Sequence, residues 1–258
     1  MTVDAAAEKL LRRDRLITVG GLALITGLAW LYLWLLVAEM NGMRDSMAGL
    51  MELRPWTATD AGLMFAMWAI MMIAMMTPSA APMILLYVRV QRGRTEEQPF
   101  APTAVFFAGY LAAWIAFSLA LTILQWALEG AALLSPTLTS TSAIFGGAAL
   151  IIAGIYQWLP IKNVCLGHCR SPVHFLSTYW RPGAWGAFRM GQSHGLYCLG
   201  CCWVLMILLF VGGVMNLLWA AAIAIFVLIE KAAPFGHVAG RAGSLILIVG
   251  GVATIIGV

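Results

Sequence analysis

The chain has 258 residues, of which 62% are hydrophobic and only 10% are charged, and its mean hydropathy is +0.90. A chain with so few polar residues cannot cover a water-soluble globule, so an integral membrane protein surrounded by a lipid bilayer is expected. The net charge of +4 reflects basic residues between the apolar stretches. It gives no reason to expect a nucleic acid partner.

Long apolar blocks predict the membrane spans. A spanning helix needs roughly 20 apolar residues, and the blocks show none of the alternation that is typical of barrel strands. The predicted fold is therefore an all-α, polytopic transmembrane helical bundle of about seven spans, in a single integral membrane domain over residues 1–258. The predicted spans are residues 16–38, 61–88, 101–127, 142–160, 194–213, 216–230 and 243–257, of which the last two are short.

The distribution of lysine and arginine predicts the orientation. If the N terminus is cytoplasmic, all 15 of these residues lie inside except Arg44 and Arg54, as the positive-inside rule requires. The apolar run after KLLRRDR is too long for a signal peptide, so it is predicted to be a retained first helix. We expect a multi-pass protein of the bacterial inner (cytoplasmic) membrane. Residues 161–193 are predicted to be an interfacial cytoplasmic segment, either a lid under a site or an ordinary loop.

The second predicted span is rich in methionine, in the stretch GLMFAMWAIMMIAMMTPSAAPM. Thioethers are soft ligands that bind Cu(I), although methionines in a helix also simply fill gaps in its packing. Pro78 and Pro82 predict a bend in the same helix. The candidate ligands in this span are Met67, Met71, Met72, Met75 and Met76.

All 5 cysteines lie between residues 165 and 202, together with three of the 4 histidines. The spacing of His194, Cys198 and Cys201 places them on one face of a helix. A single cysteine in a helix is commonly a small buried hydrophobe, but clustered thiols and imidazoles are typical of sites for Cu(I), Zn²⁺ or iron-sulfur centres. Cytoplasmic thiols stay reduced, which favours metal binding over disulfides. The candidate metal ligands are Cys165, His168, Cys169, His194, Cys198, Cys201 and Cys202.

Few polar residues interrupt the apolar blocks. Glu129 and Glu230 lie near predicted helix ends, where solvation at the interface would explain them. The side chains of Gln125, Gln157 and Asn216 are expected to form hydrogen bonds between helices. The sequence contains neither a phosphate-binding loop nor a chain of intramembrane carboxylates, so we assign no catalytic residue.

Three segments, MWAIMMIAMMTPSAAPM, CLGHCRSPVHFL and GQSHGLYCLGCCWVLM, resemble a bacterial family of predicted metal-binding integral membrane proteins. This domain of unknown function has MMxAMMxPS and HGxYCxGCCW motifs, and the resemblance covers most of the chain from about residue 60 onward. It implies a helical membrane protein with a metal site. The positions that match the family are Met71, Met72, Met75, Met76, Pro78, Ser79, Cys165, Cys169, His194, Cys198, Cys201 and Cys202.

Thioether and thiolate ligands share a preference for Cu(I), so handling of this ion is the leading functional hypothesis. The protein would bind Cu(I) and deliver it or move it across the membrane, with a metallochaperone or a membrane complex as a possible partner. One alternative is a membrane oxidoreductase that uses a metal centre or the Cys198–Cys201 pair, since C-x-x-C thiols form disulfides readily. Another is an accessory or assembly subunit of a larger complex in which zinc is a structural clip.

Overall fold

The computed structural model describes residues 3–46, 56–94, 99–135 and 138–257. Within these ranges the chain is helical, apart from loops and an isolated antiparallel bridge between Leu134 and Ser140. The predicted all-α polytopic bundle is therefore confirmed. The helices are α1 (Val3–Ser46), α2 (Ala58–Arg94), α3 (Phe100–Gly130), α4 (Ala143–Tyr156), α5 (Pro160–Arg170), α6 (Pro172–Tyr179), α7 (Gly183–Ile207), α8 (Leu209–Gly212), α9 (Leu217–Ala232) and α10 (Gly236–Ile256).

Fewer helices than expected are long and apolar enough to cross a membrane. The described residues contain 5 such spans, formed by α1, α2, α3, α7 with α8, and α10, and a sixth if α4 and α5 are one span bent by 64°. The predicted span at 216–230 corresponds to α9, whose 16 residues fall short of the roughly 20 that a bilayer requires. The expected number of seven is therefore not reached by this measure.

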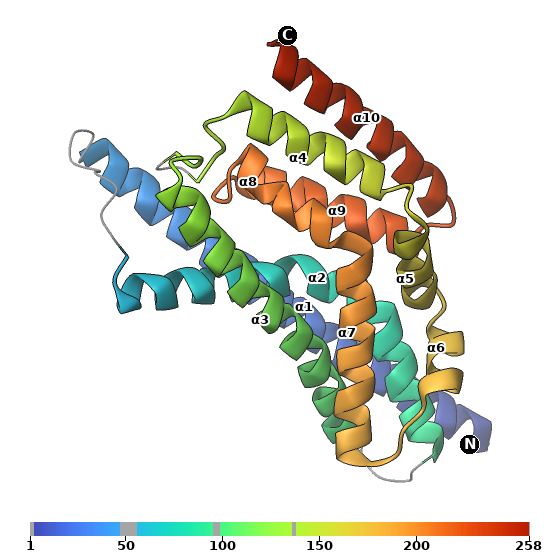
Figure 1. The fold of residues 1–258 in the computed structure, drawn as a ribbon. Coiled ribbons are helices and arrows are strands. Elements are labelled where there is room, and N and C mark those ends of the chain that lie inside the picture. Colours follow the sequence, from blue (N-terminus) through green and yellow to red (C-terminus); the bar gives the residue numbers. More distant parts are fainter. Residues whose placement is uncertain (1–2, 47–55, 95–98, 136–137, 258) are drawn as a thin grey trace.

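The predicted interfacial segment 161–193 is almost entirely helical. It contains α5, α6 and the first turns of α7, which begins at Gly183 rather than at residue 194. Pro160 and Pro172 occupy the first turns of α5 and α6, where a missing N–H removes no helical hydrogen bond. Both short helices lie beside α7 (Figure 1). Of the two arginines expected outside, Arg54 and the side chain of Arg44 lie outside the described residues.

Helices α1 and α2 form an antiparallel pair with two polar attachments. Near one end, Arg92 Nε donates to Asp14 at 2.6 Å. Further along, Trp30 Nε1 donates to the Ala74 carbonyl at 3.2 Å. Because Pro78 has no N–H, this carbonyl lacks its usual partner one turn later in α2. The tryptophan of α1 thus satisfies a group that the proline of α2 exposes.

Two helix pairs approach closely through small residues. Where α3 crosses α7 (Figure 1), a Cβ on Gly191 would overlap the carbonyl of Phe106, and one on Gly109 would overlap that of Phe188. Helices α4 and α10 run side by side, and a Cβ on Gly147 would lie 2.6 Å from the Gly251 carbonyl. Small residues at helix contacts are typical of membrane bundles. The α3–α7 contact fixes the position of the cysteines of α7.

Candidate metal centre

Helix α7 supplies three buried cysteines. Cys198, Cys201 and Cys202 are each 1% exposed. The thiols of Cys201 and Cys202 both donate to the Cys198 carbonyl, at 3.0 Å each, because side chains three and four positions along a helix reach back over the preceding turn. The three sulfur atoms are therefore held around one turn of α7.

A fourth thiol comes from α5. Cys169 is half-buried and lies near the thiols of Cys198 and Cys201. One turn earlier, Cys165 packs against α7 at Gly200, where a Cβ would lie 2.7 Å from its Sγ. The two cysteines of α5 therefore lie in the same part of the bundle as the three cysteines of α7.

Helix α2 adds a thioether. Met76 Sδ lies 4.0 Å from Cys202 Sγ, and Met76 is fully buried. The bend region that contains Pro78 follows directly. The other four candidate ligands of this span are buried in the core, each no more than 2% exposed: Met67, Met71, Met72 and Met75.

A lysine and a tyrosine complete the surroundings of Cys198. Lys231, in the last turn of α9, places its Nζ 2.8 Å from Cys198 Sγ and 3.3 Å from Ser79 Oγ. The Tyr110 hydroxyl lies 3.1 Å from Cys198 Sγ and donates to the Met76 carbonyl at 3.1 Å. An ammonium group in contact with a buried sulfur stabilises negative charge on that sulfur. Sequence reasoning missed both residues as members of the site.

The signal that could have identified Lys231 was its place beside Glu230 at the end of an apolar run, since ionisable residues at membrane depth are often functional. The sequence suggested that Glu230 is solvated at the membrane interface, but the structure shows a different environment. This carboxylate is 3% exposed and accepts hydrogen bonds from Lys162 Nζ at 2.6 and 2.8 Å. Next to this pair, Arg170 donates to the carbonyls of Glu230 and Ala233, which holds α5 against the end of α9.

The two candidate histidines have different surroundings. His194 is 3% exposed, lies one turn before Cys198, and packs its ring against Phe175 and Tyr110 with centroids 5.4 and 5.7 Å apart. Its Nδ1 is buried and has no hydrogen-bond partner. His168 instead stacks on Tyr197 at 4.1 Å. The structure therefore places His194, and not His168, beside the cysteines.

The donor set suits a soft monovalent metal. The buried thiols of Cys198, Cys201 and Cys202, the half-buried thiol of Cys169 and the thioether of Met76 lie in one part of the bundle, and these are the ligands that Cu(I) prefers. Within the described ranges no three His, Cys, Asp or Glu side chains already surround a common point as metal ligands. Two of the thiols are directed at the Cys198 carbonyl instead. Binding would therefore require these side chains to rotate and to lose their protons.

Comparison with known proteins identifies a family. No curated protein and no solved structure matches the chain. One family model does match, over residues 65–254, and its description is PpoB2, copper chaperone. The match includes every helix that contributes to the cluster of Met76, Cys169, Cys198, Cys201, Cys202 and Lys231. Because it covers well over half of the chain, this protein belongs to the PpoB2 copper chaperone family.

Proposed function

We propose that this protein binds Cu(I) at the buried thiol cluster and exchanges it with a partner, in the bacterial inner membrane. The observation that supports this most is the convergence of three buried side chains, Cys198 and Cys202 of α7 and Met76 of α2, with the half-buried Cys169 of α5 nearby. Membership of a copper chaperone family supports copper as the metal, and the soft donor atoms favour its monovalent state.

The thiolates of Cys198 and Cys202 are the proposed primary ligands, with Met76 as a third, weaker donor. Two thiolates and one Cu⁺ carry a net charge of −1, which is costly to bury without a counter-ion. The Lys231 ammonium, 2.8 Å from Cys198 Sγ, supplies that counter-ion. A lysine in this position would stabilise the site that holds copper. Its ammonium form cannot itself bind the metal, because it has no free lone pair.

Exchange requires a path of weaker sites on either side. Cys169 lies near both Cys198 and Cys201, so the ion could pass from one pair of thiols to the next. The buried methionines of α2 provide weak donors on the other side. Several weak sites favour movement of an ion, whereas one tight site would trap it. We propose transfer along this line as the delivery step.

The test is elemental analysis of the protein purified in detergent under reducing, anaerobic conditions and loaded with Cu(I). We expect near-stoichiometric copper in the wild type and its loss in the Cys198→Ser/Cys202→Ser double variant. Cys165→Ser is the matched control, since it removes a thiol one turn from Cys169 and should retain copper. Unchanged copper in the double variant, or zinc in its place in the wild type, would contradict the proposal.

A further inference from the structure

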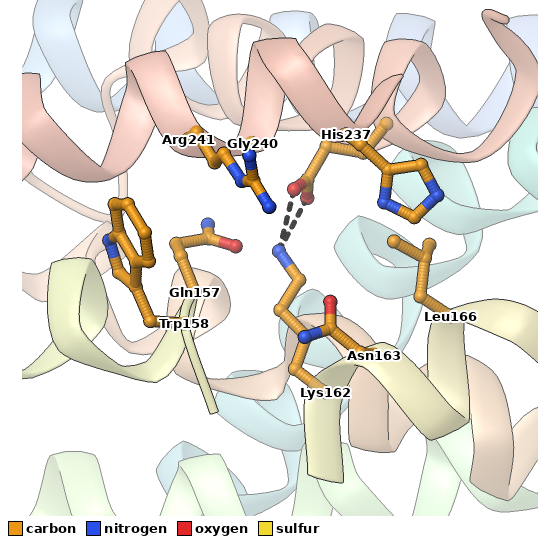
Figure 2. A pocket seen from close by; sticks show the side chains of 9 residues that line it. Gln157, Trp158, Lys162, Asn163, Leu166, His237, Gly240 and Arg241 are labelled. Carbon is orange, nitrogen blue, oxygen red and sulfur yellow. Dashed lines mark hydrogen bonds and ion pairs between the residues drawn. The ribbon is translucent and has the colours of Figure 1, made fainter. Parts of the chain in front are cut away.

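A cavity of about 120 Å³ lies between the end of α4, α5, the end of α9 and the first turns of α10, and none of the cysteines lines it. One buried water needs roughly 10–15 Å³ of such space, so this cavity has room for a group of several atoms. Figure 2 shows that Gln157, Lys162 and Arg241 point into the same space from opposite helices. These side chains are polar, although the surrounding helices are largely apolar.

Gln157 is the group that most needs a ligand. Its side chain lines the cavity and the residue is 9% exposed, yet both its Nε2 and its Oε1 are buried without a hydrogen-bond partner. The sequence predicted an interhelical hydrogen bond for Gln157, and the structure does not contain one. Leaving both ends of a buried amide unpaired is unfavourable, so a bound group that both donates and accepts would be stabilised here.

The charge of the cavity favours an anion. Lys162 is matched by Glu230 in a buried ion pair, so the guanidinium of Arg241 is the remaining positive charge of the lining. Arg241 lies 5.8 Å from the Trp158 ring centroid. Its planar group has the donor geometry for binding two oxygens of an oxyanion.

The position of the cavity matches the level of lipid head groups. Trp158 at its rim is 53% exposed, and tryptophan is enriched where a membrane meets water. Apolar side chains of α10 continue from the rim and are exposed, for example Leu245 at 58% and Val249 at 66%. Basic pockets between membrane helices commonly bind lipid phosphates.

We propose that this cavity is a binding site for a phosphate group, with Arg241 and the Gln157 amide as its direct contacts. The Lys162–Glu230 pair fixes the opposite wall, and the absence of a side chain at Gly240 keeps the space open, because a Cβ there would lie 2.5 Å from Glu230 Oε1. The inference is independent of copper binding, since no residue of the lining contributes to the thiol cluster.

The experiment is isothermal titration calorimetry on delipidated, full-length protein in a detergent without phosphate. The probes are inorganic phosphate, short-chain phosphatidylglycerol and acetate. We expect saturable binding of a phosphate-containing probe, weakened at least ~10-fold in Arg241→Gln because a charge-assisted contact is lost. Arg189→Gln is the matched control: it removes an exposed arginine of α7 outside the cavity and should bind as the wild type does.

The three probes distinguish free phosphate from a lipid head group as the ligand. Equal binding of inorganic phosphate and of the lipid would assign the site to free phosphate, whereas binding of the lipid alone would assign it to a head group. Binding of acetate in preference to both, no saturable binding by the wild type, or undiminished binding in Arg241→Gln would overturn the proposal. Gln157→Leu, which removes the unpaired amide, should weaken binding as well. Copper content should stay unchanged in Arg241→Gln, which separates this proposal from the previous one.

Discussion

Lys231 is the residue whose chemistry departs furthest from its surroundings, because its ammonium group lies buried against a cysteine sulfur. In the proposed loaded state it neutralises the charge of a copper bis-thiolate. We expect Lys231→Met to weaken Cu(I) affinity at least about tenfold, since loss of one member of a buried ion pair costs about 3–5 kcal/mol and about 1.4 kcal/mol corresponds to a factor of ten. Competition with a chromophoric Cu(I) chelator measures this affinity.

Lys231→Arg is the control for that measurement, because it keeps the charge while changing the shape of the group. It should lose less affinity than Lys231→Met. Equal affinities for Lys231→Met and the wild type would show that the lysine has no part in charge balance.

His168, unlike Lys231, is not expected to contribute to Cu(I) affinity. Its ring stacks on Tyr197 and its Nδ1 lies 2.9 Å from the Val164 carbonyl, so it is occupied by contacts outside the thiol cluster. His168→Ala should leave Cu(I) affinity within about twofold of the wild type and reduce stability by roughly 0.5–1.5 kcal/mol, the range for a ring pair. Chelator competition and thermal unfolding would test the two parts. A large loss of affinity would return His168 to the set of ligands.

The sequence predicted the candidate cysteine ligands of the site better than it predicted the residues that contact them from other helices. Spacing along one helix brings Cys198 and Cys201 to one face, and no tertiary information is needed for that. The contact of Lys231 with Cys198 depends on how α9 packs against α7, which the sequence spacing does not encode. Gln157 was expected to form a hydrogen bond with another helix, but its amide has no partner, and this outcome also depends on how the helices pack.

At the scale of elements, the α3–α7 crossing holds the cysteine helix in place. A Cβ on Gly191 would overlap the backbone of Phe106, and backbone cannot move aside as a flexible side chain can. We expect Gly191→Ala to reduce the stability of the protein by about 1–3 kcal/mol or more and to weaken Cu(I) binding, because Cys198 would shift with its helix. Thermal unfolding and chelator competition on the same sample would measure both effects.

Gly62→Ala is the matched control for this substitution. It makes the same change in α2 at a position where a Cβ would meet nothing within 4 Å. Alanine is the better helix former by roughly 0.8–1.0 kcal/mol, so this variant should be as stable as the wild type or slightly more so. Similar behaviour of the two variants would contradict a special role for the crossing.

The helix boundaries show where composition is informative and where it is not. Long apolar blocks predicted α2 and α3 well, because such blocks have no alternative to helix in lipid. The start of α7 at Gly183 was not predicted, since the residues before 194 include arginine and tryptophans that are equally typical of an interfacial loop. The end of α9 is held by Arg170 and Lys162, through contacts between helices that the composition of α9 does not predict.

At the scale of the whole molecule, the thiol cluster and its counter-ion connect α2, α5, α7 and α9. A ligand that binds only the folded protein stabilises it, by about 2.7 kcal/mol at a free concentration one hundred times its dissociation constant. Cu(I) should therefore raise the thermal unfolding midpoint of the wild type by several degrees. The same addition to the Cys198→Ser/Cys202→Ser variant should produce no rise, and an equal rise in both would place the bound copper elsewhere.

The hydrogen bond from Trp30 to the Ala74 carbonyl has a consequence for assembly. Its acceptor lies within the part of the chain that matches the family, whereas its donor lies outside that part. With the Asp14–Arg92 pair, about 24 Å away along α1 at 1.5 Å per residue, it gives α1 two fixed points on α2. A slip by one turn would break both contacts, so the register of the first helix is set by the folded proline-containing helix.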